Sequence, residues 1–143
     1  MTTQPANLLV ALVALLNADP GVAALLSDDT AVYGTRIPDD KVELMPANCV
    51  LVKPAGGSLH IGDIEIAWRR FDVLAYGKSS LDSESLHLAV REALRTLERY
   101  GADGFVIHEA HCEMDGVGGD DPLTGWPVTL ASYRVLAALT ATA

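Results

Sequence analysis

The stretch IEIAWRRFDVLAYGKSSLDSESLHLAVREALRTLERYG, residues 64–101, decides the fold, because a long strand passes directly into a long helix. From 81 to 100 the apolar residues recur at intervals of three and four, which places them on one face of a helix. Serine and aspartate at 79–82 offer oxygens that cap a helix start. Gly101 is the residue type expected just past a helix end. The sequence therefore predicts a helix over 81–100, preceded by a strand that ends at Tyr76.

This strand changes its apolar face part of the way along. Apolar side chains occupy even positions from 64 to 68 and odd positions from 71 to 75. Because side chains alternate between the two faces of a sheet, a regular strand cannot bury both sets on one face. The change falls at Arg69 and Arg70. It predicts a β-bulge there, or a strand that leaves its own sheet surface to join an assembly.

The flanking sequence supplies further elements. We expect helices at 5–17 and 20–27, a turn at 38–40, and a flexible acidic loop at 116–122. We expect strands at 31–36, 49–52, 105–115 and 126–139, the second of them ending at the turn residues 54–57. This order predicts one α+β domain over 1–143, with a mainly antiparallel sheet on which the N-terminal helices and the long helix pack.

The first helix contains an unbroken apolar run, LLVALVALL, at residues 8–16. Nine residues are too few to span a bilayer, which needs about 20. No positive charge precedes the run, since the first basic residue is Arg36, so it does not match a signal peptide. All-round apolarity predicts a helix that packs on several sides. In a small domain, one of those sides can belong to another subunit.

Composition narrows the classes of partner. The 143 residues contain 10 Lys and Arg against 19 Asp and Glu, giving a formal net charge of −9. Such a surface repels phosphate, which disfavours a conventional grip on nucleic acid and binding to an anionic membrane surface. The two cysteines, Cys49 and Cys112, form neither a disulfide framework nor a thiolate metal site. Both lie in apolar runs, where we expect buried, unreactive thiols in a reducing compartment.

The sequence contains candidate metal and catalytic residues, each of which also has a simpler structural explanation. Glu109, His111 and Glu113 share one strand face and would hold a divalent ion only if another segment or subunit added ligands. The alternative is a polar sheet face that is solvated or meets a neighbouring subunit. The glycine-rich acidic segment lacks the ligand spacing of an EF-hand and the Lys-Ser/Thr of a phosphate-binding loop. The sequence has no G-x-S-x-G motif. We therefore expect no enzyme, no metal and no cofactor, although a paired-carboxylate site stays open.

Several segments, taken together in order and spacing, are similar to one protein family. They are VYGTRIP at 32–38, MPANCVLV at 45–52, RFDVLAYG at 70–77 running into the Ser-rich helix start, and DPLTGW at 121–126 before a closing strand that contains Tyr133. This series resembles the tail terminator proteins, also called tail completion or tail-to-head joining proteins, of long-tailed bacteriophages. The resemblance covers most of the chain, and no single motif carries it.

The resemblance implies a structural role. Such proteins assemble as a ring, usually hexameric, that caps the end of the tail tube and stops its polymerisation. The ring then binds the head completion (stopper) protein, and DNA passes through its lumen without sequence-specific binding. The chain would be assembled in the host cytoplasm and reside in the virion at the head–tail junction. Two alternatives remain: another connector component such as a stopper or adaptor, and a small enzyme or ligand-binding domain.

A ring subunit needs two different surfaces that fit each other. We expect a positive cluster at Arg69 and Arg70 and a negative cluster at Glu109 and Glu113 to pair across subunits and to set the register of the ring. We expect the acidic loop to lie near the lumen, where it would repel passing DNA. The residues expected at subunit or partner interfaces are Arg69, Arg70, Glu109, His111, Glu113, Asp120, Asp121 and Trp126.

Overall fold

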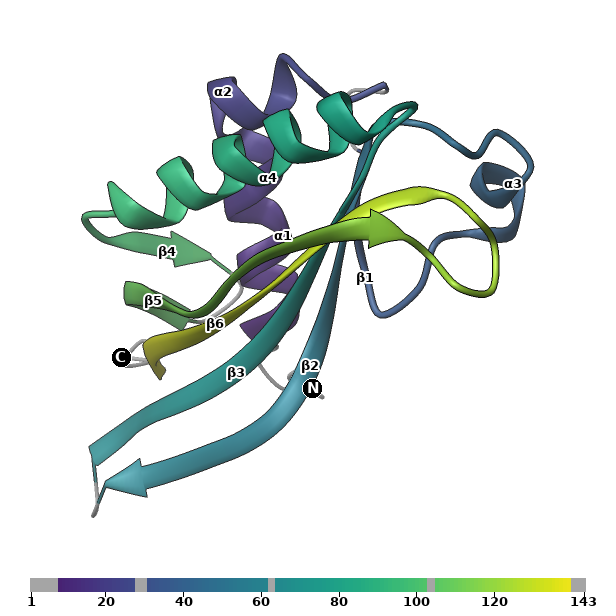
Figure 1. Cartoon of the computed structure of the whole chain (residues 1–143). Helices are drawn as coiled ribbons and strands as arrows, with labels where there is room; N and C mark the ends of the chain where they lie inside the picture. The colour runs from purple at the N-terminus through teal and green to yellow at the C-terminus, as the bar shows by residue number, and fades with distance from the viewer. Residues whose placement is uncertain (1–7, 28–30, 62–63, 103–104, 140–143) are drawn as a thin grey trace.

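The computed structural model describes residues 8–27, 31–61, 64–102 and 105–139. In these ranges a six-stranded sheet has the order β1-β2-β3-β6-β5-β4. Helices α1 and α4 lie across one of its faces (Figure 1). The parallel pair is β1 with β2, and the four remaining pairs are antiparallel. The predicted α+β class is confirmed, and the sheet is mixed. Its strands are β1 (Val32–Gly34), β2 (Cys49–Ile61), β3 (Ile64–Tyr76), β4 (Tyr100–Ala102), β5 (Phe105–Asp120) and β6 (Pro127–Leu139).

The N-terminal helix α1 (Leu8–Ala18) forms the centre of the main core. Five of its eleven residues are buried, and most of the others are half-buried. Val10 and Ala18 are the exceptions, and about half of the Val10 surface is exposed. The apolar side chains of α1 are therefore covered largely by the same chain, because the sheet and α2 (Pro20–Ala23) pack against several sides of the helix. No helix in the described ranges is long and apolar enough to cross a membrane.

Helix α4 (Ser80–Arg95) begins where the sequence predicts. The Ser79 side chain accepts a hydrogen bond from the backbone N–H of Asp82, at 3.2 Å. The helix ends about one turn earlier than predicted, with Thr96 at its C-cap. The prediction of helix as far as 100 is wrong because the residues around Gly101 form β4 and pair with the start of β5. Strand pairing here overrides helical periodicity.

The expected bulge lies in the neighbouring strand. Pairing of β3 with β6 runs without interruption from Ile66 to Tyr76, so β3 carries no bulge on that side. The irregularity is in β2, where Pro54 pairs with Phe71 and the next partner is Ser58, opposite Arg69. The expected end of that strand at 54–57 is therefore wrong: the chain loops out slightly and continues to Ile61. Trp68 lies on one face of the sheet with Arg134 and His111, whereas Phe71, Val73 and Ala75 lie on the other face in the core.

Strand β5 corrects the prediction of a flexible loop at 116–122. Pairing with β6 continues through Val117, Gly118 and Gly119 to Asp120. Three register shifts interrupt this pairing, and each lets the strand bend without leaving its partner. The glycines of this segment therefore belong to a bent strand and not to a flexible loop. Only the short segment between Asp120 and Pro127 forms the connection to β6.

The remaining short elements differ modestly from expectation. Helix α2 is four residues long where 20–27 was predicted, and a single-turn helix, α3 (Asp39–Val42), replaces the predicted turn at 38–40. Strand β1 is shorter than the predicted 31–36. The start of the predicted helix at 5–17 falls partly outside the described residues.

The two faces of the sheet are covered unequally. Phe71, Val73 and Tyr133 belong to the large core beneath α1 and α4. On the other face a smaller cluster, which includes Cys49 and Tyr76, lies at one end beneath the segment around α3. Along the rest of that face, Arg70 of β3, Arg134 of β6 and Glu109, His111 and Glu113 of β5 are exposed. We call this exposed part, around Arg70, Arg134 and His111, the open face.

Candidate functional site

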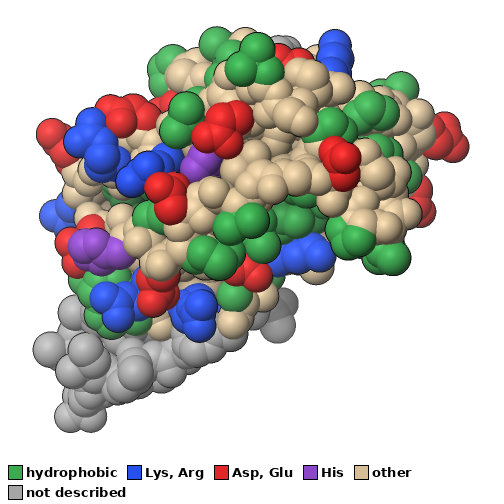
Figure 2. Space-filling view, viewed as in Figure 1, with side chains coloured by type: hydrophobic (Ala, Val, Ile, Leu, Met, Phe, Trp, Pro, Cys, Tyr) green, Lys and Arg blue, Asp and Glu red, His purple; other side chains and the backbone are tan. Residues whose placement is uncertain are grey.

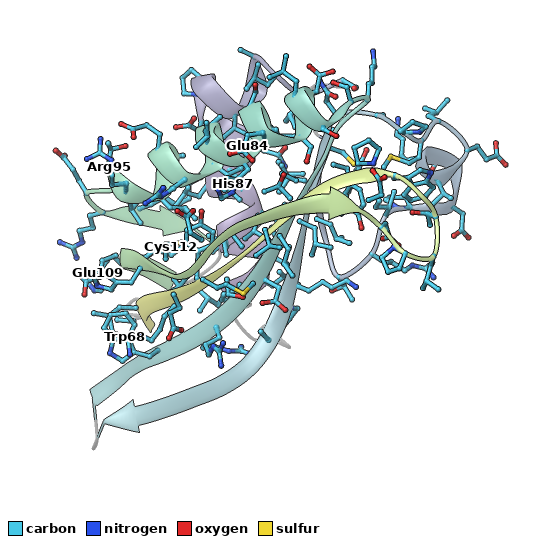
Figure 3. All side chains as sticks on the ribbon, viewed as in Figure 1. Trp68, Glu84, His87, Arg95, Glu109 and Cys112 are labelled. Atoms are coloured by element: carbon cyan, nitrogen blue, oxygen red, sulfur yellow. The ribbon has the colours of Figure 1, made fainter. Side chains whose placement is uncertain are left out.

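Six of the eight predicted interface residues lie on strands β3 and β5, with Asp120 at the very end of β5. Arg70 and Glu113 approach to 3.3 Å between Nε and Oε1. His111 Nε2 and Glu109 Oε1 are likewise 3.3 Å apart. Figure 3 shows Glu109 and Trp68 at the same end of the molecule. The structure therefore brings four of these residues together on the open face.

Arg69 stands apart from this group. Its guanidinium carbon lies 5.9 Å from the centre of the Phe71 ring, on the opposite side of the sheet from Arg70. The expectation that the two arginines act as one cluster is wrong, because neighbouring residues of a strand point to opposite faces. Within the chain, Arg70 pairs with Glu113, and its pairing across subunits stays a prediction.

The sequence did not identify two further members of the open face. The Arg134 guanidinium lies 4.6 Å from the Trp68 ring centre. The rings of Trp68 and His111 are centred 5.6 Å apart. These side chains come together because Arg70 on β3 and His111 on β5 both lie opposite Arg134 of β6 in the register of the sheet. Such cross-strand register cannot be read from one strand, although Trp68 has the same parity as Arg70.

The remaining predicted residues lie at the connection between β5 and β6. We call residues 120–126 the β5–β6 turn. Asp121 organises it: its Oδ1 accepts hydrogen bonds from the N–H groups of Leu123 and Thr124, at 2.8 and 3.3 Å. Its carbonyl accepts from Gly125 N–H at 2.7 Å, and Gly125 has a left-handed φ of 76°. Trp126 anchors the turn edge-on against the Tyr76 ring, 6.0 Å away. Asp120 is exposed.

A cavity of about 370 Å³ lies between the C-terminal half of α4 and the start of β5. We call it the α4–β5 cavity. Tyr133 lines it and is about 1% exposed, and its hydroxyl has no hydrogen-bond partner among the described residues.

Cys112 also lines the α4–β5 cavity and is exposed, which corrects the expectation of a buried thiol. Burial raises the pKa of Cys49 to about 12, which confirms that this thiol is not activated. The other lining residues are Arg91, Leu94, Arg95, Leu97, His108, Glu109, Ala110 and His111.

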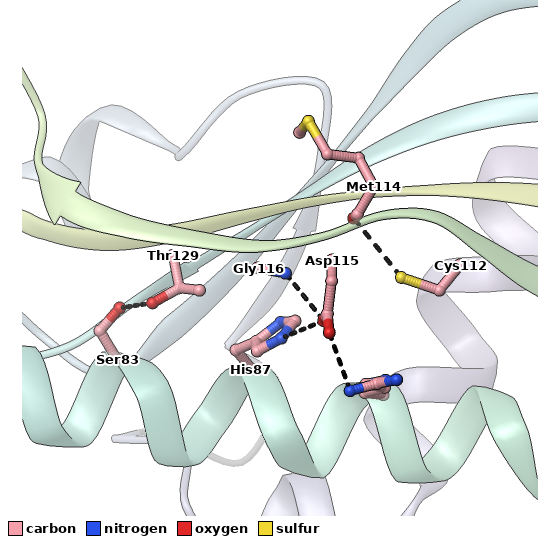
Figure 4. Close-up of polar contacts among 8 residues, drawn as sticks. Ser83, His87, Cys112, Met114, Asp115, Gly116 and Thr129 are labelled. Atoms are coloured by element: carbon pink, nitrogen blue, oxygen red, sulfur yellow. Dashed lines mark hydrogen bonds and ion pairs between the residues drawn. The ribbon is translucent and has the colours of Figure 1, made fainter.

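Next to this cavity, Asp115 joins α4 to β5 (Figure 4). Its Oδ1 lies 3.3 Å from Nε2 of the buried His87, and its Oδ2 lies 3.0 Å from Arg91 Nη1. The Gly116 N–H also donates to Oδ1, at 2.8 Å. That bond, with the positive charge of Arg91 and the contact to His87, lowers the pKa of the Asp115 carboxyl. Asp115 is therefore held as a carboxylate that fixes the helix to the strand.

The open face carries side chains of mixed charge. Figure 2 shows Lys and Arg close to Asp and Glu over the end of the molecule where α4 ends. Within the described ranges, no three His, Cys, Asp or Glu side chains are grouped so that they could hold a metal ion. A second cavity, of about 230 Å³, lies at the other end of the molecule and is lined mainly by apolar side chains such as Ile37 and Met45.

Comparison with known proteins shows a similarity of fold. No family model and no curated protein matches the sequence. Among solved structures, a chain of the "Virion of native gene transfer agent (GTA) particle" superposes with a TM-score of 0.70 at 16% sequence identity. The match covers 92% of this chain and 94% of that chain. The two chains therefore share one fold over nearly their whole lengths.

Proposed function

We propose that this protein is a structural component of a phage-type virion. The observation that carries the proposal is the shared fold with the virion chain over more than nine-tenths of both proteins. Fold alone does not assign function, so the proposal also depends on the order of sequence segments that resembles the tail terminator family.

Within that class, we propose a tail terminator. The protein would form a hexameric ring on the end of the tail tube, stop polymerisation of the tube and bind the head completion protein. Its role would be mechanical, without catalysis or cofactor. The two ends of the subunit support this proposal, because they carry different surfaces. One end has the α4–β5 cavity, and the other has the β5–β6 turn with Leu123 at 94% exposure. Ring closure needs such unlike surfaces.

The charge of the chain fits a channel through which DNA moves. With a net charge of −9, the subunit as a whole repels phosphate. On the open face, Arg70 is paired with the Glu113 carboxylate, and the Glu109 carboxylate lies beside His111, so acidic groups accompany the basic ones there. We therefore propose that DNA passes through the ring without sequence-specific contacts.

The decisive experiment mixes the purified protein with polymerising tail tube subunits and images the products. A tail terminator gives capped tubes of uniform length, and native mass spectrometry of the protein gives a closed ring. Uncapped tubes of unlimited length together with binding to the head completion protein would instead identify a stopper or adaptor. A protein that stays monomeric and binds neither component would refute the structural role.

A further inference from the structure

We propose that the β5–β6 turn of one subunit inserts into the α4–β5 cavity of the next subunit. This inference rests on the proposed ring and names the two surfaces that close it. The occupant of the cavity is a second copy of this chain, with Leu123 leading and Asp120 beside it.

The two surfaces lie at opposite ends of the subunit. In Figure 3, Arg95, Glu109 and Cys112 mark the end that holds the cavity, and the connection from β5 to β6 lies at the other end. His111 pairs with Arg134 and Asp120 pairs with Pro127, so the sheet advances roughly 23 Å between them, at about 3.3 Å per residue of β6. One subunit therefore cannot fill its own cavity with its own turn. A head-to-tail contact between copies uses both surfaces and repeats around a ring.

The turn is already shaped for insertion. Asp121 fixes its backbone from within, and Trp126 holds its base against Tyr76. Leu123 projects from the tip, 94% exposed, which is the highest exposure among the large apolar side chains of the described residues. An apolar side chain on a rigid support binds with little loss of conformational entropy.

The cavity has the complementary chemistry. Leu94, Leu97 and Ala110 supply apolar walls for a leucine side chain. The guanidinium groups of Arg91 and Arg95 lie at its side, each with N–H groups beyond those used in their contacts to Asp115 and Glu92. These donors suit an aspartate carboxylate.

An independent observation comes from the floor of the cavity. The Tyr133 hydroxyl is buried and has no hydrogen-bond partner among the described residues. An unpaired buried hydroxyl is unfavourable, because it has lost its hydrogen bonds to water without gaining others. A polar group brought in with the turn of another subunit would remove that penalty. Tyr133 lines the cavity, so the isolated subunit holds beside the cavity a buried donor that its described residues leave unused.

Cross-linking tests the contact directly. Cys112 lines the cavity and Cys49 is buried, so the variant Leu123→Cys pairs an engineered tip thiol with a native cavity thiol. A short bismaleimide should link assembled subunits into a ladder of multiples. The ladder should disappear in Leu123→Cys/Cys112→Ser. A matched control is Leu81→Cys, since Leu81 is 75% exposed but lies at the start of α4. Rings whose Leu123→Cys subunits link no better than this control would overturn the inference and leave the ring itself standing.

Charge reversal tests the same contact without cysteine. Asp120→Lys and Arg95→Glu each place like charges at every interface, and each should weaken assembly by about tenfold or more. In an equimolar mixture, alternating subunits match at every interface, so assembly should recover. A mixture that assembles no better than either variant would overturn the pairing. Wild-type protein that neither assembles nor caps tubes would instead refute the proposed function.

Discussion

The buried imidazole of His87 on α4 meets the carboxylate of Asp115 on β5, with Nε2 and Oδ1 3.3 Å apart. The contact depends on the next residue along the strand. A Cβ atom at position 116 would lie 2.5 Å from His87 Nε2 and 2.7 Å from Thr129 Cγ2. The absence of a side chain at Gly116 is therefore what lets the helix approach the strand closely.

Gly116→Ala should destabilise the protein for this reason. The methyl group would have to displace His87, which is itself buried, and overpacking of this kind costs about 1–3 kcal/mol. Urea denaturation measures the free energy of unfolding. Gly118→Ala is the matched control in the same strand, because the nearest atom to its added Cβ is 3.8 Å away. Equal effects of the two substitutions would contradict the close approach at 116.

Asp115 should contribute to stability in a pH-dependent way. Its pKa is lowered in the folded state by the Gly116 N–H, Arg91 and His87. A carboxyl with a depressed folded pKa stabilises the protein above its unfolded pKa of about 3.9. That contribution is lost as pH falls through the folded pKa. Asp115→Asn should therefore be less stable than wild type at pH 7, and the difference should shrink at pH 3. Glu98→Gln, at an exposed position, is the control, and an equal gap at both pH values would refute the coupling.

Ser83 and Thr129 should behave as a coupled pair. The Ser83 hydroxyl donates to the Ala75 carbonyl at 2.7 Å and lies 2.8 Å from Thr129 Oγ1, and both residues are buried. Ser83→Ala leaves buried polar groups unpaired and should cost about 1–3 kcal/mol. Thr129→Val should cost a similar amount. In the double variant the losses should be less than additive, because the second substitution removes a group that the first had orphaned. Additive losses would show that the two hydroxyls do not interact.

Sequence patterns correctly predicted those elements that are set by a nearby capping residue or by a continuous apolar run. The start of α4 followed from the capping position of Ser79, and the burial of α1 followed from its continuous apolar run. Long-range strand pairing was not predictable. The residues around Gly101 look helical but pair with β5, and the glycines at 116–119 look like a loop but pair with β6.

The candidate sites show the same division. The sequence pointed to Arg70, Glu113 and the turn at Asp121, because charged strand residues and turn residues stand out along the chain. It did not reveal that Arg134 lies over Trp68, since that contact depends on the register of three strands. The α4–β5 cavity was missed for a related reason. It depends on how far α4 stands from β5, and apolar periodicity carries no information about that spacing.

Removal of the Tyr133 hydroxyl should separate subunit stability from assembly. Tyr133→Phe keeps the ring in the core and deletes a group with no described partner, so the isolated subunit should be unchanged or more stable by up to about 1 kcal/mol. Tyr133→Ala is the contrasting variant and should cost about 3–5 kcal/mol, because it leaves a large cavity. Thermal unfolding reports these differences. Assembly followed by native mass spectrometry should nevertheless be weaker for Tyr133→Phe, since the inserted turn loses a donor. If Tyr133→Phe instead lowered the stability of the isolated subunit by about 2 kcal/mol, the hydroxyl would have a partner within the subunit and the prediction would be wrong.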